Sequence, residues 1–146
     1  MTDTTRPEDL ARGLFEALND ENKEEFVESF GPGARIENGG DATDVETLWE
    51  AELTMFEAFP DHVHAVETIV TDDRSAAVEF TFSGTHEGEY DGIPPSGNHV
   101  SVLGQCLFVC THAGIDEWRI VSDSLGFYSQ LGAIEPPYDH RYEAFR

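Results

Sequence analysis

The chain has 146 residues, enough for one domain with its own hydrophobic core. It carries 30 Asp and Glu residues against 8 Lys and Arg, a net charge of −22 that argues against nucleic acids and anionic membranes as partners. Such an acidic surface suits a salt-rich cytoplasm, where ions screen the repulsion between carboxylates. No apolar stretch reaches the roughly 20 residues of a membrane span, and the polar N-terminus is unlike a signal peptide. We therefore expect a cytoplasmic protein.

The first half of the chain is predicted to form three helices. Pro7 suits the first turn of a helix, and apolar residues recur behind it at helical spacing. Asp20 is the predicted N-cap of a short second helix that the Gly-Pro-Gly sequence at 31–33 ends, before a short strand at 34–38. The segment Thr43–Glu46 has the pattern of a capping box, with Thr43 as the cap. The third helix that follows has one apolar face, which consists of Val45, Leu48, Trp49, Leu53 and Phe56.

The second half is predicted to form a sheet. Four strands are expected over residues 62–70, 75–86, 99–110 and 115–125, and short turns join them. Strands connected in this way form an antiparallel sheet, and helices followed by strands indicate an α+β domain with the helices on one face. The expected fold is a single domain, a curved antiparallel sheet wrapped by N-terminal helices around a hydrophobic pocket. Residues 133–146 are expected to form a C-terminal arm.

The last hairpin sets the expected register. A turn centred near Ala113 would place Arg119 opposite Leu107 and Asp123 opposite Leu103. Because side chains alternate across a sheet, Arg119 and Asp123 then share one face of the last strand.

The two faces of this strand are expected to have different roles. We expect the face with Arg119 and Asp123 to border a cleft beneath the helices, beside their aromatic residues. The opposite face carries Trp118 with Phe108, and the helices cannot cover both faces. An exposed apolar face of this kind predicts a homodimer.

Asp123 is the candidate acid–base residue. Desolvation in an apolar cleft disfavours the ionised carboxylate, whereas a neighbouring Arg119 favours it. Opposed effects of this kind suit a group that takes and returns a proton. The alternative is a structural ion pair between Asp123 and Arg119.

Two segments resemble the SnoaL-like polyketide cyclase family, also described as ester cyclases. Residues 59–100 contain Phe-Pro-Asp at 59–61, Gly-Thr-His at 84–86 and Gly-Ile-Pro-Pro-Ser-Gly at 92–97, similar to the family's FPD, GTH and GIPPTG elements in the same order. Residues 114–132 are similar to the family's last strand, where a glycine-isoleucine turn leads to an aspartate and a closing QLG. The resemblance implies the cone-shaped α+β fold of ketosteroid isomerase and scytalone dehydratase, and a dimer. It also implies an intramolecular aldol condensation without metal or cofactor, in which Asp123 moves the proton.

Several other residues have two interpretations. His86 could orient a substrate oxygen, or it could hold the loop that follows it. His62 and His64 alternate onto one strand face, but with no third ligand no metal is expected. Cys106 and Cys110 lie too far apart on one strand for a disulfide and are interpreted as core residues.

The sequence thus predicts a cyclase or isomerase that needs no cofactor and acts on a small hydrophobic carbonyl compound. A non-catalytic binding protein, a dehydratase and an epoxide hydrolase remain as alternatives. Around Asp123, the candidate substrate-binding residues are His86, Arg119, Trp49, Phe56, Phe59 and Gln105.

Overall fold

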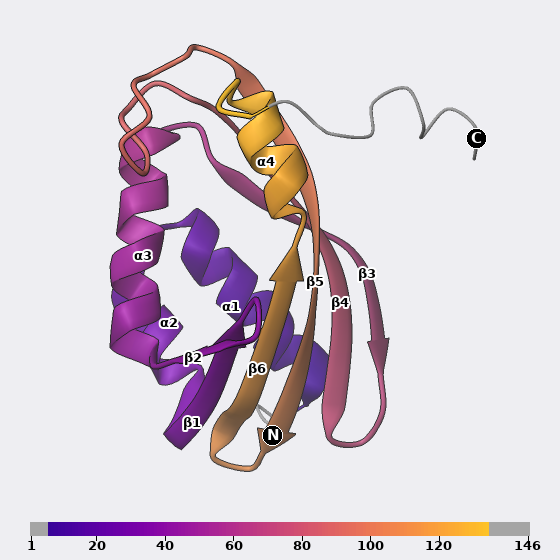
Figure 1. Cartoon of the computed structure of the whole chain (residues 1–146). Helices are drawn as coiled ribbons and strands as arrows, with labels where there is room; N and C mark the ends of the chain where they lie inside the picture. Colours follow the sequence, from indigo (N-terminus) through magenta and orange to yellow (C-terminus); the bar gives the residue numbers. More distant parts are fainter. Residues whose placement is uncertain (1–5, 135–146) are drawn as a thin grey trace, which may run out of the picture.

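A curved six-stranded sheet with helices gathered on one side forms the protein (Figure 1). The computed structural model describes residues 6–134, so nearly all of the predicted arm at 133–146 lies outside the described residues. The helices are α1 (Pro7–Asn19), α2 (Lys23–Glu28), α3 (Val45–Ala58) and α4 (Ser124–Gln130). The strands are β1 (Phe30–Asn38), β2 (Asp41–Thr43), β3 (Val63–Thr71), β4 (Ser75–Thr85), β5 (His99–Thr111) and β6 (Gly114–Ser122). The predicted α+β architecture is confirmed.

The sheet has the strand order β2-β1-β6-β5-β4-β3. The four long strands β3 to β6 pair antiparallel, as predicted, and Arg119 pairs with Leu107 in the expected register. The prediction of a wholly antiparallel sheet is wrong at one position, because β1 pairs parallel with β6. The Gly-Pro-Gly sequence at 31–33 lies inside β1, where a register shift accommodates it. Neither β2 nor α4 was predicted.

Two predicted helix caps are wrong by one or two positions. Asn22 caps α2, since its side chain accepts a hydrogen bond from the Glu25 N–H at 3.1 Å, and Asp20 instead ends α1. Asp44 caps α3 in place of Thr43 and accepts from the Thr47 N–H at 2.8 Å. Thr43 is already paired in strand β2, so the next residue takes the capping role.

The predicted assignment of the two sheet faces is inverted. Trp118 is 2% exposed and Phe108 is 0% exposed, and their rings stack at 5.3 Å on the helix-covered side. Phe15 of α1 lies 6.2 Å from Phe108, between ring centroids. On the outer side, Arg119 donates to Glu117 at 3.1 Å, an arrangement that keeps both charges in contact with water. Alternation sets which residues share a face, but the charged pair decides which face is covered. Trp118 therefore cannot form a dimer interface.

Two apolar clusters make up the core. The larger one joins α1 and α3 to the sheet, and the smaller one lies under α4 and the end of α3. Leu48, Trp49 and Phe56 of α3 are buried as predicted, whereas Leu53 is 43% exposed. Within residues 6–134, no helix combines the length and the apolar character needed to cross a membrane.

Candidate active site

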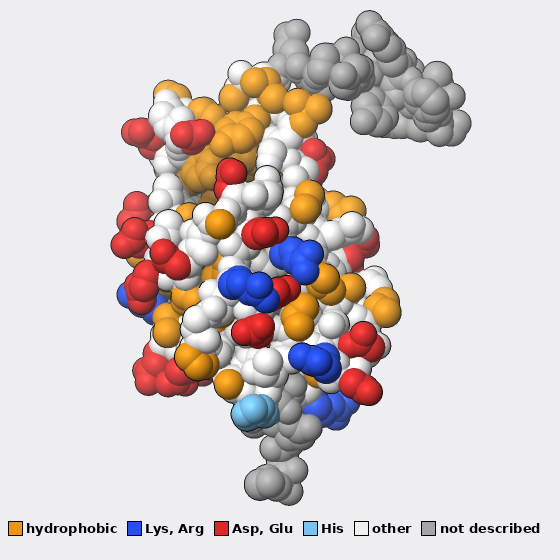
Figure 2. Space-filling model, turned by 60° about the horizontal axis from the view of Figure 1, so that its bottom comes forward, with side chains coloured by type: hydrophobic (Ala, Val, Ile, Leu, Met, Phe, Trp, Pro, Cys, Tyr) orange, Lys and Arg blue, Asp and Glu red, His pale blue; other side chains and the backbone are white. Residues whose placement is uncertain are grey.

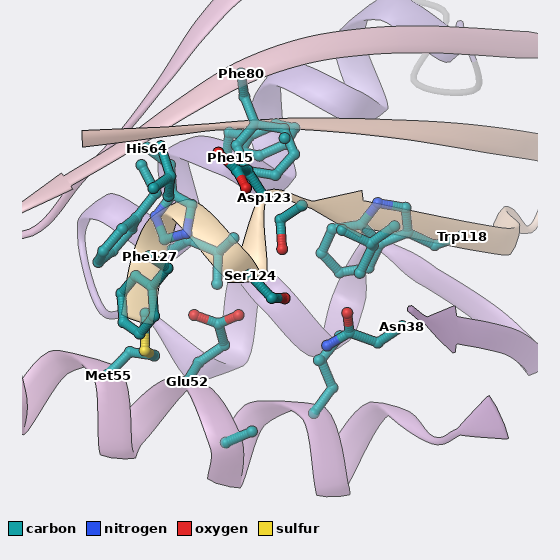
Figure 3. A pocket seen from close by; sticks show the side chains of 18 of the residues that line it. Phe15, Asn38, Glu52, Met55, His64, Phe80, Trp118, Asp123, Ser124 and Phe127 are labelled. Atoms are coloured by element: carbon teal, nitrogen blue, oxygen red, sulfur yellow. The ribbon is translucent and has the colours of Figure 1, made fainter. Parts of the chain in front are cut away.

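A cavity of about 240 Å³ lies between the helices and the inner face of the sheet (Figure 3). Residues of both core clusters line it, so its walls are largely apolar: Phe15, Leu18, Leu48, Ala51, Met55, Phe80, Phe82, Val102, Trp118, Ile120 and Phe127. A smaller polar set lies among them, made up of Asn38, Glu52, His64, Tyr90, Ser122, Asp123, Ser124 and Tyr128. Neither Lys nor Arg lines it among the described residues. Apolar walls with a few polar groups are typical of small-molecule sites.

Asp123 lines this cavity because the chain leaves the sheet just before it. Strand β6 ends at Ser122, and Asp123 is the N-cap of α4, where its Oδ1 accepts from the Gly126 N–H at 2.8 Å. Strand alternation no longer governs Asp123, so it can face the cavity while Arg119 points outward. Among residues 6–134, no hydrogen bond involves Oδ2. One carboxylate oxygen is thus fixed by the cap, and the other is left for a ligand.

Gly126 provides the space that the Asp123 carboxylate occupies. A Cβ atom at position 126 would lie 2.7 Å from the Asp123 Cγ and would overlap a carboxylate oxygen. Asp123 can therefore keep this rotamer only with glycine at position 126.

Glu52 is a second carboxyl in the cavity and was not among the predicted site residues. It projects from α3 toward the space that Asp123 and Ser124 border from the other side (Figure 3). Burial raises the pKa of Glu52 to about 7. Its spacing could have revealed it, because Glu52 follows Leu48 by four residues and precedes Phe56 by four, which places an acid on the buried face of α3.

His64 provides a neutral imidazole on the cavity wall. Its side chain is buried on β3, and burial, with a smaller effect of His62, lowers the pKa of His64 to about 4. Asn19 fixes this position, donating to the His64 carbonyl at 2.9 Å and accepting from the His64 N–H at 2.7 Å. In residues 6–134, no group of three or more His, Cys, Asp or Glu side chains is arranged to hold a metal ion.

The six predicted substrate-binding residues do not line the cavity. Trp49 and Phe56 are buried in the larger core cluster, and Phe59 lies in the smaller one. Arg119 and Gln105 lie on the outer sheet face, where Gln105 donates to Glu79 at 3.1 Å. The predicted pair of Asp123 with Arg119 does not form, because Arg119 pairs with Glu117 on the opposite side of the sheet.

His86 holds the loop that follows it. The ring is completely buried, and its Nδ1 accepts from the Ser96 N–H at 3.1 Å and lies 2.8 Å from the Ser96 Oγ. Because a backbone N–H can only donate, Nδ1 is the acceptor and the neutral ring carries its proton on Nε2. This geometry matches the loop-holding interpretation of His86.

The three motifs within residues 59–100 form one brace at the end of the sheet. The Asp61 carboxylate accepts from the Thr85 N–H at 2.7 Å and from the Thr85 hydroxyl at 2.8 Å, and these bonds lower the pKa of Asp61. A Cβ atom at Gly84 would lie 3.0 Å from the Phe59 Cβ, so glycine permits this close packing. Together with the His86–Ser96 contact, the brace ties the end of α3 to β4 and to the loop before β5.

The two cysteines are core residues, as predicted. Both are free and buried, and burial raises the pKa of Cys106 to about 12 and that of Cys110 to about 11. Neither thiol is a nucleophile at neutral pH.

Comparison with known proteins agrees with this fold. The sequence profile of the SnoaL-like polyketide cyclases matches residues 8–131. No curated protein matches the chain.

Solved structures share the fold. AclR from Streptomyces galilaeus is 20% identical, with a TM-score of 0.83 over 94% of this chain and 92% of AclR. IdmH from Streptomyces antibioticus is 28% identical, with a TM-score of 0.79 over 86% of this chain and 98% of IdmH. A protein from Jannaschia sp. CCS1 is 24% identical, with a TM-score of 0.77 over 89% of this chain and 93% of its own. Since the profile spans most of the chain, this protein belongs to the SnoaL-like polyketide cyclase family.

Proposed function

We propose that the protein is a cyclase or isomerase that acts without a cofactor on a small hydrophobic carbonyl compound, with Asp123 as the acid–base residue. The observation that supports this most directly is the Asp123 carboxylate on the wall of a largely apolar cavity. Family membership adds support, as does the 28% identity to IdmH, which is a proposed polyketide cyclase.

The proposed reaction begins with proton abstraction by Asp123. The carboxylate takes a proton from a carbon next to a carbonyl, and the electrons of the broken C–H bond pass into an enolate. The enolate carbon attacks a second carbonyl carbon in the same molecule, which forms a C–C bond and an alkoxide. Asp123 returns its proton to the alkoxide oxygen, so the carboxylate is restored and the product is an isomer of the substrate.

The capping interaction suits Asp123 to this role. The Gly126 N–H binds Oδ1 at 2.8 Å, which fixes the orientation of the carboxylate relative to the cavity. Apolar residues of the same cavity, such as Phe80 and Phe127, would surround the hydrocarbon part of a substrate.

A homodimer is also proposed, through the outer sheet face. Val121 and Val70 are each 65% exposed on this face, and Leu103 is 47% exposed. Val121 and Val70 border a shallow groove that also contains Arg119 and is lined by more apolar than polar surface. On the face in Figure 2, acidic and basic side chains lie next to one another with apolar side chains between them. A surface with both signs of charge and apolar contacts can complement a second copy of itself.

Exchange of ketone protons for deuterium tests the proposal without knowledge of the natural substrate. Hydrophobic aryl ketones and 1,3-diketones would be incubated with the protein in concentrated salt in D₂O, and deuterium at the carbon next to the carbonyl followed by NMR. D123N keeps a residue that can cap α4 but removes the base, so the exchange rate should fall by about 10² or more. D116N is the matched control, since Asp116 lies on β6 outside the cavity. Equal exchange by D123N would contradict the role of Asp123, and no exchange by the unaltered protein would favour the binding-protein alternative.

A further inference from the structure

Glu52 has no partner of its own in the cavity. Among residues 6–134, no hydrogen bond or ion pair involves its carboxyl, and no Lys or Arg is among the residues that line the cavity. Asp123, by contrast, accepts the Gly126 N–H. A carboxylate in apolar surroundings is costly without a partner, whereas a protonated carboxyl is neutral and can donate a hydrogen bond.

The groups around Glu52 do not favour its ionised form. Its neighbours in the cavity wall on α1 are Phe15 and Leu18, which are apolar. His64 on β3 is neutral near pH 7, because burial lowers its pKa to about 4. The other titratable residues that line the cavity are an acid and two phenols, Asp123, Tyr90 and Tyr128, and Asp91 pairs with Tyr128. Outside the lining, His62 stacks on Phe56 of α3, and Lys23 pairs with Glu46 of the same helix at 3.0 Å. The pKa of about 7 for Glu52 agrees with this arrangement.

Neither tyrosine of the cavity forms a hydrogen bond with Glu52 among the described residues. Tyr128 donates to the Asp91 Oδ2 at 3.0 Å, and its hydroxyl also faces that of Tyr90. Their pKa values are raised, first by burial, and the Glu52 carboxyl contributes to the rise at Tyr90. Both tyrosines line the cavity together with Glu52, but among residues 6–134 neither forms a hydrogen bond with it, so the Glu52 proton remains free for a ligand.

We propose that Glu52, in its protonated form, donates the hydrogen bond that holds the carbonyl oxygen of a ligand in this cavity. The inference rests on the proposed function, in that it takes the cavity as the substrate site. A protonated Glu52 would make the cavity selective for uncharged compounds whose oxygen accepts a hydrogen bond. With Asp123 on the opposite wall, Glu52 would hold the oxygen on which the enolate charge forms while Asp123 faces the neighbouring carbon.

Binding of 1-tetralone, a small bicyclic ketone that can only accept hydrogen bonds, tests this selectivity. Its dissociation constant would be measured by quenching of tryptophan fluorescence in concentrated salt, because Trp118 lines the cavity. Between about pH 6 and pH 8.5, binding to the unaltered protein should weaken at least tenfold as Glu52 loses its proton. In E52Q, the amide still donates a hydrogen bond, so binding should persist and lose its dependence on pH. In the matched control E50Q, the exposed Glu50 of the same helix is changed and the pH dependence should remain.

Three results would overturn the inference. These are pH-independent binding by the unaltered protein, an unchanged pH dependence in E52Q, and absence of tetralone binding at any of these pH values. None of them bears on the effect of D123N on proton exchange across the wider set of ketones, so the proposed function can fail or survive separately.

Discussion

Removal of the Glu52 charge should change how the stability of the protein depends on pH. The pKa of Glu52 is about 7 in the folded protein against an ordinary value of 4.5, so the folded state holds one proton more than the unfolded state between these pH values. Stability from the neutral carboxyl is fully present below about pH 4.5 and is lost as the pH rises through 7. At 1.36 kcal/mol per pKa unit the full loss is about 3 kcal/mol. Because the side chain is partly exposed toward the cavity, we expect about 2 kcal/mol.

E52Q removes this titration and keeps the size of the side chain. The free energy of unfolding would be measured by urea titration in concentrated salt, from about pH 5 to pH 8.5, for the unaltered protein, E52Q and E50Q. Near pH 5, E52Q and the unaltered protein should differ little. Above about pH 7.5, E52Q should be more stable by about 2 kcal/mol.

The difference between the two proteins isolates Glu52 from the other titrating groups. His64 acts in the opposite direction, since its lowered pKa makes stability fall as the pH drops from 6.5 to about 4. His64 and the many surface acids are present in both proteins, so their contributions cancel. A stability difference that stays constant over the whole pH range, or that also occurs with E50Q, would refute the assignment of a perturbed carboxyl to Glu52.

Two further predictions concern Asp123 and the outer sheet face. G126A should displace the Asp123 carboxylate, lowering ketone proton exchange by about 10² while the thermal midpoint changes little, since the helix propensity gained with alanine offsets the lost cap of α4. Normal exchange by G126A would show that the orientation of Asp123 is unimportant. V121D places a charge on the outer face at a position that is 65% exposed, so it should convert a dimer to a monomer of 16.2 kDa in light scattering at high salt, with unchanged circular dichroism. A monomer before the substitution, or a dimer after it, would remove the proposed interface.

The sequence predicted the pairing of the last hairpin but not which side the helices cover. The turn fixed Arg119 opposite Leu107, as the structure confirms. Both faces of β5 carry apolar residues, so hydrophobicity alone could not choose between them. Polar residues on neighbouring strands determine which face stays in water. Gln105 pairs with Glu79, and burying these polar groups would cost free energy, whereas burying Trp118 is favourable.

Asp123 lines the cavity as predicted, but strand alternation is not the reason. Alternation placed it on the face of Arg119, which is the outer face. It reaches the cavity because β6 stops at Ser122 and the aspartate begins α4, an element that the sequence analysis did not predict. Glu52 was missed because the large acidic excess makes any single acid look like surface, although its helical spacing placed it among buried residues.

Of the motif residues that carry the family resemblance, Asp123 alone lines the cavity. The Phe-Pro-Asp and Gly-Thr-His motifs contribute a brace, Asp61 with Thr85, and no member of either motif lines the cavity. Both motifs thus have a structural role in this protein, whose fold also occurs in AclR, a proposed hydroxylase, and in IdmH, a proposed cyclase. Ligand choice has to come from the cavity wall, where α3 supplies Glu52 at a position outside every motif. Substrates should accordingly differ between relatives with the residue at this position, even where the brace is the same.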